Sequence, residues 1–124
     1  MSQSLDRYLY TIRTLHDRYM CVRSVDVAHY LGISKASVST AVRLLRERGL
    51  IVVEEDGNLV LTDLSKARAE RLNKRVMFFQ QWLTSAGVES SQALRDAISF
   101  SWEMSETSYE AFKAMKADLT GTEP

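Results

Sequence analysis

The sequence predicts a mainly α-helical fold, and three observations lead to this expectation. Apolar residues recur at steps of three and four through most of the 124-residue chain, which is the spacing of amphipathic helices. Strand-type composition is confined to residues 50–62, where Asp56-Gly57-Asn58 is typical of a hairpin turn. Helical stretches precede and follow this hairpin, so we expect an N-terminal winged helix-turn-helix followed by a helical dimerisation domain.

The first three helices are bounded by residues that cap or end helices. Ser24 is expected to cap a short second helix, which Gly32 ends by taking a left-handed conformation. Ser34 is expected to cap a third helix, which Gly49 ends. The first helix is predicted over roughly residues 4–19, and its apolar positions are Leu5, Tyr8, Leu9, Ile12, Leu15 and Tyr19.

The second half of the chain continues with three predicted helices. Thr62 can cap the first, which runs to about residue 85 before Gly87. The other two are expected near residues 90–103 and 106–118. We therefore expect a DNA-binding domain over residues 1–63, a dimerisation domain over residues 64–119 and a frayed tail over residues 120–124.

The third helix has the two faces expected of a helix that enters the DNA major groove. Its apolar stripe is Val38, Ala41, Val42 and Leu45. The opposite face begins with small and hydroxyl-bearing residues, which allow close approach to base edges and phosphates. Free backbone N–H groups at its start favour a phosphate. The predicted DNA-binding residues are Ser34, Lys35, Ala36, Ser37, Ser39, Thr40, Arg43 and Arg46.

The charge distribution agrees with a DNA partner for the first part of the chain only. The net charge is zero, but residues 1–50 hold eight basic and four acidic residues, whereas residues 51–124 hold eight and twelve. The basic half is the one with the predicted recognition helix. The hairpin carries Glu54, Glu55 and Asp56, which repel phosphate, so we expect the wing to stabilise the domain and not to contact DNA.

Other function classes find little support in the sequence. The chain has no Gly-rich phosphate loop, no nucleophile elbow and no cluster of His and Cys at metal spacing, so we expect a protein that is not an enzyme. The single Cys21 forms no internal disulfide, and no signal peptide or membrane span is evident, so we expect a cytoplasmic protein. A winged helix used only for protein–protein contacts stays open, since the net charge is neutral and the wing is acidic.

The chain resembles the diphtheria toxin repressor and manganese transport regulator family over about residues 5–117. The resemblance is carried by LDRYLYTI, SVDVAHYLGISKASVSTAVRLLRERGLI and NLVLTDLSKARAERL, and by RVMFFQQWLTSAGV followed by ALRDAISFSWEMS. It implies a homodimer built by the helices after residue 63, repression of target operons from a double-stranded DNA operator, and a manganese- or iron-binding site.

The residues at the positions of that metal site disagree with the resemblance. The family uses an acidic pair, a His and a Glu-x-x-Glu-His cluster. The matching residues here are Arg7, Tyr10, Val76, Ile98, Ser101 and Trp102. None is an ordinary ligand for a hard divalent ion. We therefore expect no metal cofactor, with apolar side chains packed where the metal binds in the family.

Two alternatives to this prediction stay open at the level of the sequence. A shift of the alignment by one residue brings in Asp6 and Glu103, so that Mn or Fe binds to displaced ligands. Further candidate donors are His16, Asp17, Cys21, His29 and Glu106. The aromatic residues of the later helices allow a ligand other than metal, although a two-fold dimer interface explains them more simply.

Overall fold

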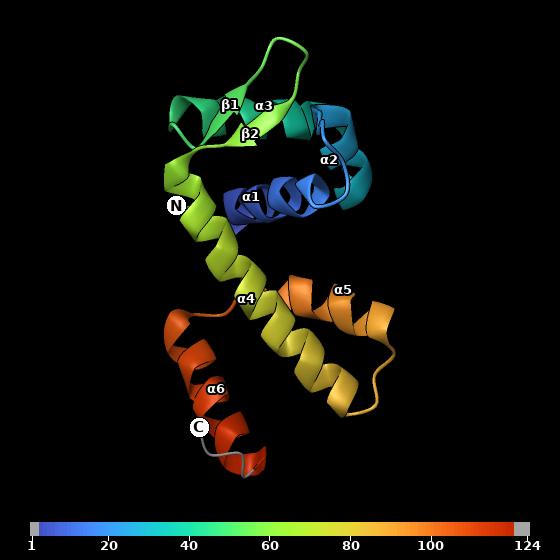
Figure 1. The fold of residues 1–124 in the computed structure, drawn as a ribbon, viewed down its shortest axis with the longest axis vertical. Helices are drawn as coiled ribbons and strands as arrows, with labels where there is room; N and C mark the ends of the chain where they lie inside the picture. The colour runs from blue at the N-terminus through green and yellow to red at the C-terminus, as the bar shows by residue number, and fades with distance from the viewer. Residues whose placement is uncertain (1–2, 121–124) are drawn as a thin grey trace. The chain divides into compact units, whose positions relative to one another are not determined.

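The computed structural model describes the backbone of residues 3–120 and the side chains of residues 5–115. Its elements, in chain order, are α1 (Gln3–His16), α2 (Ser24–Leu31), α3 (Lys35–Glu47), β1 (Ile51–Val53), β2 (Leu59–Leu61), α4 (Asp63–Ser85), α5 (Ser90–Ser101) and α6 (Glu106–Thr120). Three helices, a hairpin and three further helices are the predicted order (Figure 1). The mainly α-helical class with an N-terminal winged helix-turn-helix is thereby confirmed.

The chain divides into two compact units, residues 1–73 and 74–124. The division lies inside α4, whereas the sequence places the domain boundary after residue 63, immediately before most of α4. Thr120 ends α6, and the rest of the predicted tail lies outside the described residues. Each unit is considered by itself below.

The first unit is built around an aliphatic core. Leu9, Val38 and Leu45 have no exposed surface, and Ile12 and Leu59 are 1% exposed. They bring together one face each of α1, α3 and β2. The wing is a two-stranded antiparallel sheet in which Ile51 pairs with Leu61 and Val53 with Leu59. Burial of these aliphatic side chains is the main force that positions α3.

The start of α2 and the end of α1 differ from the prediction. Helix α1 ends at His16, and Tyr19 is 56% exposed, so the predicted extension to residue 19 is wrong. The helix ends before residue 19 because Val22 pairs with the wing. The Val22 carbonyl accepts a hydrogen bond from the Leu59 N–H at 2.8 Å. Ser24 is the first residue of α2 and not its cap. The Asp26 carboxylate instead accepts from the Arg23 N–H at 2.8 Å.

Three other predicted helix ends are confirmed, whereas α5 ends at Ser101 instead of near residue 103 and α6 at Thr120 instead of near residue 118. The Ser34 hydroxyl accepts from the Ser37 N–H at 3.1 Å and so caps α3. The Thr62 hydroxyl accepts from the Ser65 N–H at 3.4 Å at the start of α4. Gly32 has a φ of 66° at the end of α2, a left-handed conformation that side chains with a Cβ atom rarely adopt.

The second unit is held together largely by aromatic rings. Phe79 is 2% exposed and meets Phe100 at 4.9 Å between ring centroids and Phe112 at 5.8 Å. Edge-to-face contacts of this kind add to the stabilisation from burial. Arg75 joins the three helices, since its guanidinium donates to the Ser101 carbonyl of α5 at 2.7 Å and to the Glu106 carboxylate of α6 at 2.7 Å.

An open apolar groove of about 300 Å³ lies on this unit. Its lining residues are Phe79, Trp82, Leu83, Ala86, Phe100 and Phe112. They come from α4, α5 and α6, and they offer a bound molecule little besides apolar surface. Such a groove favours an apolar partner. Among the described residues, no helix combines the length and apolar character required to cross a bilayer.

Candidate nucleic-acid interface

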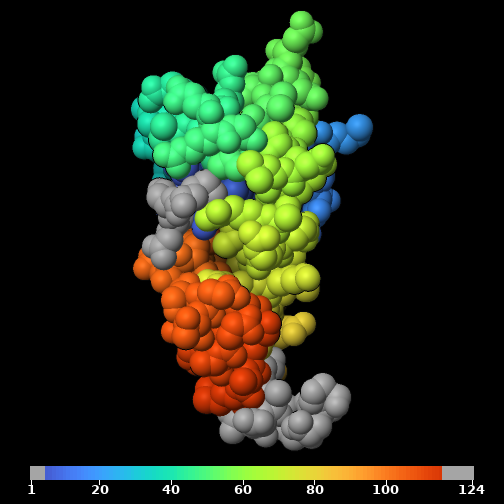
Figure 2. All heavy atoms as spheres, turned by 90° about the vertical axis from the view of Figure 1, so that its left-hand side faces the viewer, coloured from blue at the N-terminus to red at the C-terminus, as the bar shows by residue number. Residues whose placement is uncertain are grey.

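Helix α3 presents one face to the core and the other to solvent. Val38 and Leu45 are fully buried, and Ala41 is 5% exposed, which fixes the rotation of the helix about its axis. The eight residues predicted to bind DNA are all exposed: Ser34, Lys35, Ala36, Ser37, Ser39, Thr40, Arg43 and Arg46. Figure 2 shows this teal surface with the green wing rising beside it. The fold thus gathers these eight residues on one accessible surface, which we call the α3 face.

Two hydrogen bonds order the hydroxyl groups of the α3 face. The Ser34 hydroxyl donates to the Ser37 hydroxyl at 3.0 Å, in addition to its capping bond. The Thr40 hydroxyl donates to the Ala36 carbonyl, four residues earlier, at 3.1 Å. The three hydroxyl groups therefore have defined orientations before any ligand binds.

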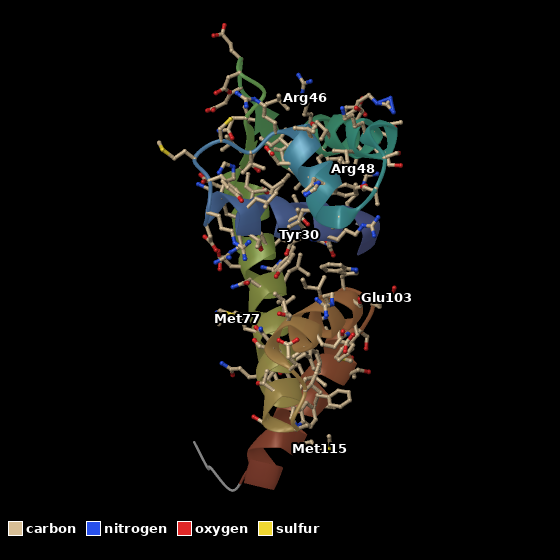
Figure 3. All side chains as sticks on the ribbon, turned by 90° about the vertical axis from the view of Figure 1, so that its right-hand side faces the viewer. Tyr30, Arg46, Arg48, Met77, Glu103 and Met115 are labelled. Atoms are coloured by element: carbon tan, nitrogen blue, oxygen red, sulfur yellow. The ribbon has the colours of Figure 1, made fainter. Side chains whose placement is uncertain are left out.

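The basic side chains of the α3 face are available for a polyanion. Within the part of the chain that the structure describes, none of the ion pairs involves Lys35, Arg43 or Arg46. Arg46 and Arg48 project near the C-terminal end of α3 (Figure 3). Unpaired guanidinium groups can bind a phosphate or the O6 and N7 atoms of guanine.

The wing is fastened to the loop before α2 by contacts that the sequence did not reveal. The Arg23 guanidinium donates to the Asp56 carbonyl at 2.7 Å, and its side chain covers Gly57. The buried Val22 N–H donates to the side-chain oxygen of Asn58 at 2.8 Å. Arg23 and Asp56 are 33 positions apart, so no local sequence pattern indicates this contact. The Glu54, Glu55 and Asp56 side chains are exposed.

In the first unit, the residues at the family's metal positions do not fit a divalent cation. Arg7 brings positive charge, and its buried Nε atom has no hydrogen-bond partner among the described residues. Tyr10 is 3% exposed, and burial raises the pKa of its phenol above the ordinary value of 10.0. A neutral phenol and a guanidinium are poor ligands for Mn²⁺ or Fe²⁺.

The second unit offers no better ligand set at its share of these positions. Val76 and Ile98 carry no donor atom, and Trp102 offers an indole N–H that cannot bind a cation. Ser101 is fully buried, and its hydroxyl donates to the Ala97 carbonyl. The six residues at these aligned positions therefore include no carboxylate and no imidazole.

The alternative metal ligands suggested by the sequence do not form a group, and several of them already form hydrogen bonds or ion pairs. The Asp6 carboxylate is held by the Arg68 guanidinium, with a second contact at 3.1 Å. His16 Nε2 lies 2.7 Å from the Leu59 carbonyl, and Glu106 pairs with Arg75 at 2.7 Å. Glu103 is exposed on the second unit (Figure 3). The described residues include no group of three or more His, Cys, Asp or Glu that could hold a metal ion.

Comparison with known proteins places the α3 face in a DNA-binding domain. Residues 1–59 match the N-terminal DNA-binding domain of the iron-dependent repressors. The matched range contains α1, α2, α3 and the strands and turn of the wing as far as Leu59.

Solved structures share the fold over most of this chain. A manganese-dependent transcriptional repressor in complex with manganese superimposes with a TM-score of 0.78 at 21% identity, covering 90% of this chain and 51% of its own. The manganese regulator SloR gives 0.75 at 18% identity, with coverages of 93% and 54%. A hypothetical protein from Sulfolobus solfataricus gives 0.62 at 20% identity, with coverages of 95% and 91%. This chain thus spans about half the length of the two manganese regulators.

Proposed function

We propose that this chain is a sequence-specific transcriptional repressor, because residues 1–59 match the DNA-binding domain of the iron-dependent repressors. It binds a double-stranded DNA operator as a homodimer and does so without a metal effector. The observation that carries this proposal is the α3 face, an exposed surface of small, hydroxyl-bearing and basic residues on a helix whose opposite side is buried.

The basic residues of the α3 face have different roles in DNA binding. Lys35 and the N-terminal N–H groups of α3 bind a phosphate, because the helix dipole favours negative charge there. Arg43 lies in the middle of the exposed face and contacts a guanine or a phosphate. Arg46, in the last turn of the helix, contacts the DNA backbone and sets the position of α3.

Metal independence is supported by ion pairs within the first unit. The Asp6 carboxylate is 12% exposed and binds the Arg68 guanidinium, which joins α1 to the first part of α4. A second bond joins the same elements, from Arg13 to Glu70 at 2.7 Å. Charged hydrogen bonds of this kind are stronger than neutral ones. Protein groups therefore hold α4 against α1 in the unit that binds DNA, with no effector required.

Homodimerisation is supported by the apolar groove of the second unit. Its lining is almost entirely apolar, so the groove favours a partner that covers it with apolar side chains. A second copy of the chain is the simplest occupant, because two-fold symmetry also places two α3 helices on a palindromic operator. In a symmetric dimer, this groove would be covered on both subunits.

The test of DNA binding is a salt titration on duplexes recovered by genome-wide capture of the bound DNA. The logarithm of the binding constant should fall linearly with the logarithm of the salt concentration, by ~0.9 for each phosphate contact. Lys35→Ala and Arg43→Ala should weaken binding, by ~1–3 kcal/mol where the arginine contacts a base. Arg71→Ala removes an exposed arginine of α4 and serves as the control. Equal binding by all four proteins would refute the assignment of the α3 face.

Metal independence requires a separate measurement. The affinity for the captured duplex is measured in chelator and again with added Mn²⁺ or Fe²⁺, and calorimetry follows any binding of these ions to the protein alone. We expect the same affinity under all conditions. Tight metal binding that raises DNA affinity would instead establish a metal-responsive repressor with displaced ligands, and loss of all duplex binding would favour a protein-interaction module.

A further inference from the structure

The hydroxyl group of Thr40 is unsuited to donate a hydrogen bond to a DNA base. It already donates to the Ala36 carbonyl at 3.1 Å, although the residue itself is exposed. A threonine bonded in this way turns its hydroxyl back along the helix. The γ-methyl group is then the part of the side chain that a ligand meets first. Thr40 therefore acts on the α3 face as an apolar residue.

Ala36 extends this apolar character along the helix. Residues four apart lie on the same side of an α-helix, about 6 Å apart along its axis. The methyl groups of Ala36 and Thr40 thus form a short strip, which we call the methyl strip. Both residues are exposed, and the strip lies among polar residues: Ser37 and Ser39 flank it, and Arg43 follows on the same side.

The major groove contains one apolar group that matches such a strip. Each base pair presents hydrogen-bonding atoms there, and thymine alone adds a C5-methyl group. Contact between methyl groups removes apolar surface from water without demanding a hydrogen bond. Bases of one strand follow each other at about 3.4 Å, so the length of the methyl strip corresponds to roughly two base steps.

We propose that Thr40 is a specificity-determining residue that selects a thymine in each operator half-site through its γ-methyl group. This inference rests on the proposed DNA-binding function and refines it, since it names the base that the centre of α3 selects. Ala36 extends the contact toward a neighbouring base, and Arg43 supplies polar recognition beyond it.

The test compares thymine with deoxyuridine, which lacks only the C5-methyl group. Duplexes are first selected from a random-sequence pool with the full-length protein. Each thymine of one half-site is then replaced by deoxyuridine in turn, and the affinity is measured. We expect one position at which replacement weakens binding by the wild-type protein ~4-fold, the effect of about one buried methylene-sized group.

Two matched variants assign that effect to Thr40. Thr40→Val keeps the γ-methyl group and removes the hydroxyl, so it should keep the loss on deoxyuridine substitution. Thr40→Ser keeps the hydroxyl and removes the methyl group, so it should bind the thymine duplex ~4-fold more weakly and no longer distinguish the two bases at that position. Both changes are at an exposed site and leave the core intact.

The outcomes separate this inference from the proposed function. Selection of a common sequence with no deoxyuridine-sensitive position, or full discrimination by Thr40→Ser, overturns the inference and leaves the repressor proposal standing. A pool with no selected sequence and no salt-dependent binding overturns the DNA-binding function itself. Discrimination that Thr40→Val loses and Thr40→Ser keeps would assign base recognition to the hydroxyl and also contradict the inference.

Discussion

The two units of this chain use apolar side chains in opposite ways. In the first unit the core is aliphatic, and its largest members, such as Leu9 and Leu45, have no exposed surface. In the second unit the rings of Phe79 and Phe100 pack against each other and also line a groove open to solvent. A unit that completes its own core can offer a polar face to a ligand. The partly buried rings around that groove leave space for a further apolar group.

The largest expected effect concerns the completed core of the first unit. Leu45→Ala should lower the free energy of unfolding by ~3 kcal/mol, because it leaves a cavity beneath α3. DNA affinity should fall with it. The measurement is chemical denaturation followed by far-UV circular dichroism. Leu64→Ala, at a position 69% exposed, is the control and should change stability by ~0.5 kcal/mol or less.

The next effect concerns the open groove of the second unit. Trp82→Ala should weaken self-association by ~2 kcal/mol, about thirtyfold in the dimer dissociation constant, because large aromatic residues dominate such interfaces. Sedimentation equilibrium gives the constant directly. Met20→Ala removes an apolar side chain that is 97% exposed on the first unit. If this control dissociates the dimer equally, exposed apolar surface in general, and not the groove, drives association.

A smaller effect is expected from the ion pair that joins α1 to α4. Asp6→Asn should cost ~1.5 kcal/mol of stability, because the Arg68 guanidinium loses a charged acceptor at a largely buried site. Asp17→Asn disrupts an exposed partner of Arg13 and should cost ~0.5 kcal/mol or less. Thermal melting of the two variants tests the comparison. Equal losses of stability would show that the Asp6–Arg68 pair contributes no more than the exposed pair of Asp17 with Arg13.

The smallest effect is a dependence of the second unit on pH. The N–H groups of Ser91 and Gln92 lower the pKa of the Glu89 carboxylate below its ordinary value of 4.5. Its contribution is present above that value and is lost as the pH falls through the lower pKa of the folded protein. Glu89→Gln should therefore show a shallower loss of melting temperature than wild type below about pH 4.5. Parallel profiles would contradict this role.

The sequence was sufficient where a local pattern determines the structure. Ser34, Gly32 and Thr62 mark helix ends that depend on neighbouring residues only, and the structure confirms each. The exposed side of α3 followed from the spacing of Val38 and Leu45.

The sequence did not predict features that depend on contacts between segments far apart in the chain. The periodic position of Tyr19 suggested a longer α1, but the pairing of Val22 with Leu59 draws the chain away from the helix. The bond from Arg23 to the Asp56 carbonyl and the pair of Asp6 with Arg68 join residues 33 and 62 positions apart. No local residue spacing predicts such contacts, because they depend on the packing of the helices that carry the two residues.

The fastened acidic wing has a consequence for how this protein would search a genome. Arg23 and Asn58 join the turn to the loop before α2, so the backbone that carries its carboxylates is held by several bonds. A fixed repulsion acts on every sequence alike and shortens the dwell time at each encounter. We expect rapid departure from unrelated DNA, so that residence at the operator depends on the base contacts of α3. The wing would thus affect how fast the protein leaves unrelated DNA, and α3 would determine the sequence at which it stays bound.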